Sequence, residues 1–149
     1  MEITEFLTPD RVILDVRSRD KPQLIAEIAR QFGRLLPAVK PYAVEAALSA
    51  REQLGSTGLG SGFALPHARI EGLNLYLGMF MRLSKSIDFE AIDSKPVQLV
   101  FALLIPAETT TPHVAALAAI TRRFRDPELV AQLRKAETPA SAYGNLTNY

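Results

Sequence analysis

VQLVFALLI, residues 97–105, is apolar at every position except Gln98. A stretch that is apolar on both of its alternating sides is typical of a strand in the middle of a sheet, covered by helices on both faces. Residues 73–83 share this property, because leucine and methionine alternate there with residues that include tyrosine, glycine and phenylalanine. The two stretches together predict an α/β fold with three layers, a helix–sheet–helix sandwich.

The first half of the chain carries signals for a further strand and two helices. Val12 to Val16 has the composition of a short strand, and Asp20 stands where the N-cap of a helix is expected. Apolar residues then recur at helical spacing and stop before Pro37. Pro41 begins a second predicted helix, which ends at Gly55.

The second half predicts two more helices and an irregular end. Thr111-Pro112-His113 reads as a helix start with threonine as the cap, and Asp126 occupies the cap position of a further helix. The stretch 88–93, which contains three acidic residues, is predicted to form a turn between strands. Residues 138–149 are polar and contain a proline and a glycine, so we expect an irregular tail.

The composition fits a single domain spanning residues 1–149. Apolar residues make up 48% of the chain and charged residues 22%, which are ordinary values for a globular protein. The 17 Lys and Arg residues nearly balance the 16 Asp and Glu residues, so the net charge is +1. Such a balance gives no basic field for nucleic acid or an anionic membrane.

The sequence also favours a cytoplasmic location. It contains no cysteine, which excludes disulfides, thiolate zinc sites and cysteine nucleophiles. Residues 1–5 are acidic where a secretory signal would be basic, and no apolar run is long enough to span a bilayer. We expect any role at a membrane to depend on a partner protein.

A pliant loop, GSTGLGSG at residues 55–62, holds four glycines, two serines and a threonine in eight positions. Glycines let successive backbone N–H groups converge on an anion, which favours a phosphate cradle. The loop lacks the Gly-Lys-Ser/Thr ending of a P-loop, the Gly-x-Gly-x-x-Gly spacing of a dinucleotide site and the Gly-x-Ser-x-Gly of a nucleophile elbow. A tight connection between a helix and a strand explains it equally well at this point.

His67 follows this loop directly after Pro66. Proline fixes its own backbone angle and biases the preceding residue to an extended conformation, so the imidazole is held on a rigid segment. A histidine with an ordinary pKa near 6.5 is largely neutral at cytosolic pH and can attack phosphorus. A structural histidine is the alternative, but the polar loop and Arg69 nearby favour chemistry.

Two further residues are candidates for the same site. His113 lies in the first turn of a predicted helix, where the helix dipole opposes imidazolium formation and favours anions. Arg51 lies on the otherwise apolar face of its helix, and a guanidinium directed inward needs an anion. Both also have plain structural explanations, as a polar residue at a helix start and a cation at a helix C-terminus. Two histidines are too few for a three-histidine zinc site; a carboxylate could complete one, but no spacing in the sequence supports it, so we predict no metal.

These residues occur in an order that resembles a known family. Arg51-Glu52, Gly55-Ser56-Thr57-Gly58-Leu59-Gly60 and Ala64-Leu65-Pro66-His67 are followed by Phe89 to Asp93, Phe101 to Pro106 and His113. This series is similar to the fructose/mannitol-type enzyme IIA domain of the bacterial phosphoenolpyruvate-dependent phosphotransferase system. The second part of the series most resembles the nitrogen-regulatory branch of that family.

The resemblance implies the fold of that family, with a mixed sheet, and a role for each candidate residue. It makes His67 the phosphoryl acceptor, at Nε2, with His113 and Arg51 lining the site. We expect Arg51 to neutralise the phosphoryl group and His113 to donate a hydrogen bond to it. The loop residues Ser56, Thr57 and Gly58, together with Arg69, are the expected binders of phosphoryl oxygens. The resemblance likewise implies no cofactor.

The resemblance also implies partners and an enzyme class. A histidine-containing phosphocarrier protein, charged by enzyme I, would supply the phosphoryl group, so the chain would be a phosphotransferase component rather than a free-standing catalyst. A regulator of this branch would control a partner such as a potassium transporter or a sensor kinase by its phosphorylation state. The alternatives are a sugar-specific enzyme IIA that passes phosphoryl to the cysteine of a separate enzyme IIB, and a binding module with a vestigial site.

Overall fold

The computed structural model describes residues 1–109 and 113–148. In these residues two short 3₁₀ helices precede the sheet, and five helices and six strands make up the rest. The elements are η1 (Ile3–Glu5), η2 (Pro9–Arg11), β1 (Val12–Val16), α1 (Lys21–Leu35), α2 (Pro41–Gln53), β2 (Gly58–Gly60), β3 (Phe63–Ala64), β4 (His67–Ile70), β5 (Leu77–Ile87), β6 (Val97–Pro106), α3 (Val114–Phe124), α4 (Pro127–Lys135) and α5 (Pro139–Thr147).

The six strands form one mixed sheet in the order β1-β5-β6-β3-β2. β5 pairs with β6 antiparallel, β1 pairs with β5 parallel, and β2 pairs with β3 antiparallel. β3 and β4 follow each other along the other edge of β6, both parallel to it. The predicted three-layer α/β fold with a mixed sheet is confirmed.

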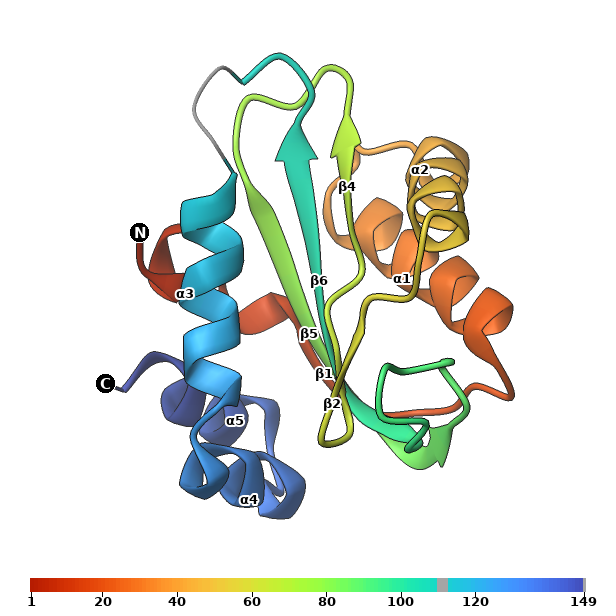
Figure 1. The fold of residues 1–149 in the computed structure, drawn as a ribbon. Helices are drawn as coiled ribbons and strands as arrows, with labels where there is room; N and C mark the ends of the chain where they lie inside the picture. The colour runs from red at the N-terminus through yellow and green to blue at the C-terminus, as the bar shows by residue number, and fades with distance from the viewer. Residues whose placement is uncertain (110–112, 149) are drawn as a thin grey trace.

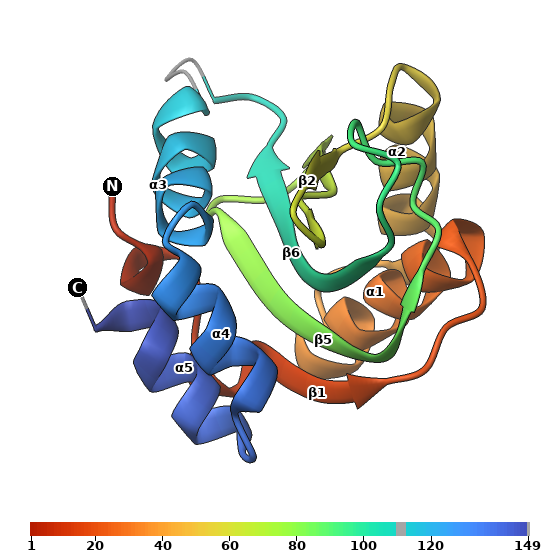
Figure 2. The ribbon, with the colours of Figure 1, turned by 60° about the horizontal axis from the view of Figure 1, so that its bottom comes forward.

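Helices cover both faces of the sheet, with α1 and α2 on one side and α3, α4 and α5 on the other (Figures 1 and 2). The alternation within β6 explains why both faces are apolar: Val100, Ala102 and Leu104 belong to the core under α1 and α2. Phe101 and Leu103 belong to the core under the other three helices. The strand that decided the prediction lies in the middle of the sheet, buried on both faces.

Several predicted element boundaries are confirmed by the hydrogen bonds of the structure. The Asp20 carboxylate accepts from the backbone N–H of Gln23 at 2.9 Å, and α1 ends before Pro37. Asp126 caps α4 in the same way, accepting from Glu128 N at 3.0 Å. The predicted cap at Thr111 and Pro112 lies outside the described residues.

The predicted strand over residues 73–83 is displaced in the structure. Residues 73–76 lie outside β5, which instead extends to Ile87. The register pairs Leu77 with Leu104, and β6 ends two residues later at Pro106. The same register would set Leu75 opposite Pro106, which has no backbone N–H, and would leave residues 73 and 74 beyond the end of β6.

The predicted irregular tail is wrong, because residues 139–147 form α5. The Thr138 hydroxyl caps this helix by accepting from Ser141 N at 3.1 Å, and Pro139 stands in the first turn, where no N–H is needed. Ala142 and Leu146 are fully buried against the core. The weak helix propensity of this segment suggested a frayed tail. The helix forms because burial of Ala142 and Leu146 outweighs that weak propensity.

The described helices include none that is both long enough and apolar enough to cross a bilayer.

Candidate functional site

The site lies at the break between β3 and β4, two short strands that both pair with β6. Pro66 separates β3 from β4, and His67 is the first residue of β4, in register with Leu103. Leu65 N donates to Thr57 O at 2.9 Å, so the interruption is tied to the glycine loop on its other side. The His67 side chain is therefore half-buried on a segment fixed by β6 and by the loop.

One ring nitrogen of His67 is already engaged by the backbone. His67 Nδ1 lies 2.7 Å from the carbonyl oxygen of Leu65, which can only accept a hydrogen bond. Nδ1 therefore carries the proton and donates it to Leu65. In the neutral ring this leaves the lone pair on Nε2, which is the nitrogen free to act as a nucleophile.

Burial lowers the pKa of His67 below its ordinary value, and electrostatic interactions with Arg51 and His113 lower this pKa further. The hydrogen bond to Leu65 and the negative charge of Glu52 act in the opposite direction but do not cancel the shift. The lowered pKa favours the neutral imidazole of His67 over the charged form. Arg51, His113 and Glu52 therefore all interact electrostatically with its ring.

His113 and Arg69 are brought together from different elements. His113 is the N-cap residue of α3, and Nη2 of Arg69, on β4, lies 3.2 Å from its Nδ1. Arginine has only donors, so Nδ1 of His113 must accept. The proton of a neutral His113 is therefore on Nε2. Arg69 is held in turn by Ala107 O, to which its Nη1 donates at 3.3 Å.

Arg51 lies in the last turn of α2, as the sequence predicts, and is half-buried. Its Nη1 donates to Gly55 O at 2.9 Å, which fixes the guanidinium over the start of the glycine loop. The prediction that Arg51 and His113 approach His67 agrees with the charge effects on the His67 pKa.

The glycine loop differs from the expected cradle. Thr57 N–H donates to both carboxylate oxygens of Glu52, at 3.1 and 3.2 Å, and Gly58 N–H donates to Ser56 Oγ at 3.0 Å. Ser56 Oγ in turn donates to Phe89 O at 2.9 Å. The N–H groups of Thr57 and Gly58 and the Ser56 hydroxyl thus hold the loop together, and the acceptor at Thr57 is the carboxylate of Glu52.

Comparison with known proteins identifies the family. Residues 5–149 match the enzyme IIA type 2 family of the phosphoenolpyruvate-dependent sugar phosphotransferase system. The chain belongs to this family. It is 36% identical to a nitrogen regulatory protein of Bradyrhizobium diazoefficiens, covering 98% of this chain and 95% of the relative. It is 34% identical to one of Pseudomonas aeruginosa, covering 96% and 93%.

A solved structure agrees with the sequence relatives. The crystal structure of the nitrogen regulatory protein IIA-Ntr from Neisseria meningitidis superposes with a TM-score of 0.90 at 33% identity. The match covers 97% of this enzyme IIA chain and 99% of that protein. The interrupted strand, the loop and the two histidines described above therefore belong to an enzyme IIA fold of the nitrogen-regulatory kind.

Sequence reasoning missed one important residue of this enzyme IIA site, Glu52. Its side chain is only 5% exposed, accepts both the N–H and the hydroxyl of Thr57, and forms an ion pair with Lys21 Nζ at 3.0 Å. The ammonium group of Lys21 also lies 4.6 Å from the centre of the Phe89 ring. An acidic residue in the last turn of a helix opposes the helix dipole, and this was the available signal that Glu52 has another task.

The described residues contain no group of three or more His, Cys, Asp or Glu side chains arranged to hold a metal ion.

Proposed function

We propose that this protein is a phosphoryl-carrying regulator of the phosphotransferase system, which accepts a phosphoryl group on Nε2 of His67 from a histidine phosphocarrier protein. The observation that carries the proposal is the hydrogen bond from His67 Nδ1 to Leu65 O, because it leaves Nε2 with the lone pair. The relatives named nitrogen regulatory proteins support the regulatory branch over sugar uptake.

In the proposed step, the lone pair of His67 Nε2 attacks the phosphorus carried by the donor histidine. The new N–P bond forms as the N–P bond of the carrier breaks, and the carrier imidazole leaves with the electron pair of that bond. The His67 ring becomes more positive, and the Leu65 carbonyl stabilises this charge through the Nδ1 proton. Transfer between two histidines is nearly balanced in free energy, so the site has mainly to position the groups and to screen charge.

The neighbouring side chains have separate tasks in this proposal. Arg51 neutralises the negative charge of the phosphoryl group, and the Nε2–H of His113 donates to one of its oxygens. Arg69 acts through His113, as a positioning residue, because its hydrogen bond to Nδ1 fixes the proton on Nε2. Ser56, Thr57 and Gly58 shape the loop through the hydrogen bonds that Glu52 and Ser56 accept.

Phosphorylation of His67 would act as a switch through charge. It adds about −1.5 to −2 charge at the site, which repels acidic partner surfaces and attracts basic ones. Two large apolar side chains flank the site, Leu54 after α2 at 85% exposed and Val114 after His113 at 64%. They offer contact area to the phosphocarrier and to a regulated partner, such as a potassium transporter or a sensor kinase.

The test is phosphoryl transfer followed by intact-protein mass. Purified protein is mixed with enzyme I, the phosphocarrier protein and phosphoenolpyruvate, and is compared with His67→Ala and His113→Ala. The expected result is an acid-labile gain of one phosphoryl group in the wild type, none in His67→Ala, and a slower gain in His113→Ala. A phosphoryl group that persists in His67→Ala, or one attached to Nδ1 by nitrogen-15 NMR, would refute the proposal.

Two additions separate the finer parts of the proposal. Arg69→Gln is expected to slow transfer and to change the His113 tautomer seen by nitrogen-15 NMR, whereas a purely structural arginine would leave that tautomer unchanged. The phosphorylated protein is then offered to an enzyme IIB of the fructose/mannitol type. Rapid and complete transfer to the enzyme IIB cysteine would favour the sugar-uptake role over the regulatory one.

A further inference from the structure

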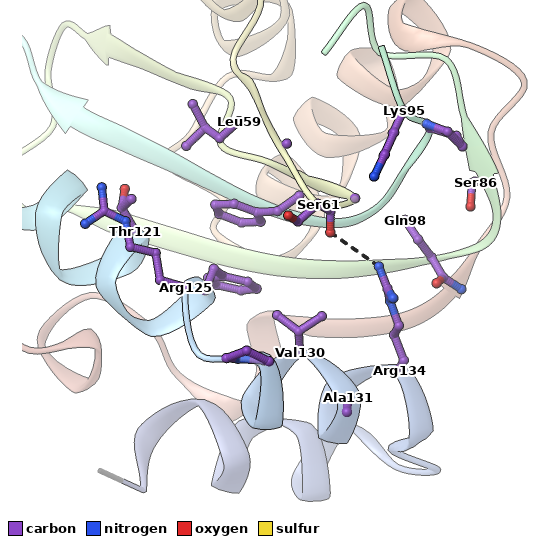
Figure 3. Close-up of a pocket in the computed structure, with 16 residues that line it drawn as sticks. Leu59, Ser61, Ser86, Lys95, Gln98, Thr121, Arg125, Val130, Ala131 and Arg134 are labelled. Atoms are coloured by element: carbon purple, nitrogen blue, oxygen red, sulfur yellow. Dashed lines mark hydrogen bonds between the residues drawn. The ribbon is translucent and has the colours of Figure 1, made fainter. Parts of the chain in front are cut away.

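A second candidate site lies away from the two histidines. A cleft of about 1020 Å³ opens between the β2–β3 hairpin, residues 95–98, the end of α3 and α4 (Figure 3). Its volume is at the upper end of the range for small-molecule sites. None of the residues assigned to phosphoryl transfer, namely Arg51, His67, Arg69 and His113, lines it.

The lining of this cleft is strongly cationic for a protein with nearly balanced charge. Lys95, Arg125 and Arg134 line it, and no Asp or Glu is among the lining residues. The carboxylate of Asp93 contacts the lining residue Ser61, since it accepts from Ser61 N at 2.9 Å. That carboxylate also accepts from the backbone N–H of Lys95, so it is engaged in holding the rim together. Three cations with no lining carboxylate favour an anionic occupant.

Two of the cations reach toward the same end of the cleft. Figure 3 shows the Lys95 and Arg134 side chains directed toward each other, with Ser61, Ser86 and Gln98 around them. The Nη2 of Arg134 donates to Ser61 O at 3.3 Å, and this is the one side-chain hydrogen bond of Arg134 among the described residues. The rest of the guanidinium donors, the Lys95 ammonium and two hydroxyls are therefore available to one ligand.

The backbone makes room for this arrangement at Gly62. A Cβ at this position would lie 2.7 Å from Nη2 of Arg134, and Gly62 has a φ of +79°, in the left-handed region. A larger residue would therefore both strain the turn and displace the guanidinium. The hydrogen bond to Ser61 O and the absence of a side chain at Gly62 let the guanidinium lie over this turn.

The other end of the cleft provides an apolar wall. Phe63 and Phe124 stack with ring centres 4.0 Å apart, and Pro127 and Val130 continue this surface. Arg125 lies beside Thr121 at this end (Figure 3). The cleft thus combines an anion-binding end with an apolar wall, as sites for small charged molecules commonly do.

We propose that this cleft binds a small phosphate monoester, with the phosphate between Lys95 and Arg134 and the organic part against the apolar wall. A phosphate suits the polar end because arginine and lysine donors with two hydroxyls can serve its three terminal oxygens together. The proposal is independent of phosphoryl transfer, since the cleft shares no residue with the His67 site. Binding should therefore persist in His67→Ala.

The test follows backbone amide shifts by NMR as ligands are added at constant ionic strength. The probes are inorganic phosphate, AMP and glycerol phosphate, with adenosine and glycerol as uncharged matches. We expect saturable shifts around Ser61, Gly62 and Lys95 with the phosphorylated probes and none with the uncharged ones. AMP binding more tightly than glycerol phosphate would show that the apolar wall takes a ring.

Two variants and one control make the test specific. Arg134→Gln and Lys95→Gln are each expected to weaken binding by about tenfold or more, the loss of one charge-assisted hydrogen bond. Lys135→Gln changes a neighbouring charge that does not line the cleft and should leave the affinity unchanged. Unsaturated shifts at millimolar concentrations, equal loss in Lys135→Gln, or shifts confined to the residues around His67 would each overturn the proposal.

Discussion

Replacing Glu52 by glutamine tests whether the buried carboxylate holds the glycine loop. The side chain is 5% exposed and binds the N–H and hydroxyl of Thr57 as well as Lys21 Nζ at 3.0 Å. Glutamine keeps one oxygen acceptor, but its NH₂ group would face a donor in place of the second carboxylate oxygen. The variant therefore loses the ion pair and at least one charge-assisted hydrogen bond.

The size of the effect follows from these contacts. A hydrogen bond to a charged group contributes about 1.5–3 kcal/mol, and breaking a buried ion pair costs about 3–5 kcal/mol. Lys21 keeps weaker partners, Glu90 at 3.6 Å and the ring of Phe89 at 4.6 Å, which reduces the loss. We expect Glu52→Gln to lower the free energy of unfolding by about 2–3 kcal/mol, a large share of a typical stability of about 5–15 kcal/mol.

The assay is urea unfolding followed by circular dichroism, with Glu27→Gln as the matched control. Glu27 pairs with Arg30 one helical turn away, and Arg30 is 63% exposed, so this control should lose no more than about 0.5 kcal/mol. The loss of negative charge near the site should also lower the pKa of His67 further. If the two variants unfold at the same urea concentration, Glu52 does not hold the loop.

Three other changes probe the site, the loop and the last helix. The pKa of His67 in the folded protein lies below the unfolded value of about 6.5, so the unfolded chain binds more protons in this range. The free energy of unfolding should therefore fall as the pH drops from about 6.5 to the folded pKa, and level off below it. His67→Gln should remove this slope in urea titrations at several pH values. Gly58→Ala would place a Cβ 2.8 Å from Ala91 Cα, so it should cost about 1–3 kcal/mol, whereas Gly144→Ala meets open space and should not destabilise. Leu146→Ala should cost about 2–5 kcal/mol by the same assay, and a loss near zero would mean that α5 does not pack as described.

The parts of the fold that the sequence predicted are those decided by local pattern. The double-sided apolar stretch of β6 and the cap at Asp20 need only their own residues and elementary geometry. The start of β5 depends instead on where β6 ends, at Pro106, and no pattern within residues 73–83 contains that information. Helix α5 could not be predicted for the same reason, because the burial of Leu146 depends on a surface formed by distant segments.

The candidate site divides in the same way. The residue types and their order predicted that His67, His113 and Arg51 belong together, and the charge effects on the His67 pKa agree. The sequence could not show that the Glu52 carboxylate accepts a hydrogen bond from the backbone N–H of Thr57. That contact depends on how the loop folds back over the end of α2. The assignment of Arg69 to the phosphoryl group stays a prediction, and the structure adds a contact of its Nη2 with Nδ1 of His113.

The different tasks of the two histidines follow from what lies behind each ring. Behind His67 is the carbonyl of Leu65, an acceptor, so the proton stays on Nδ1 and Nε2 presents a lone pair. Behind His113 is the guanidinium of Arg69, a donor, so the proton moves to Nε2 and that atom becomes a hydrogen-bond donor. One imidazole is thereby prepared to attack phosphorus and the other to bind a phosphoryl oxygen. Exchanging the backing groups, rather than the histidines, is what would exchange these roles.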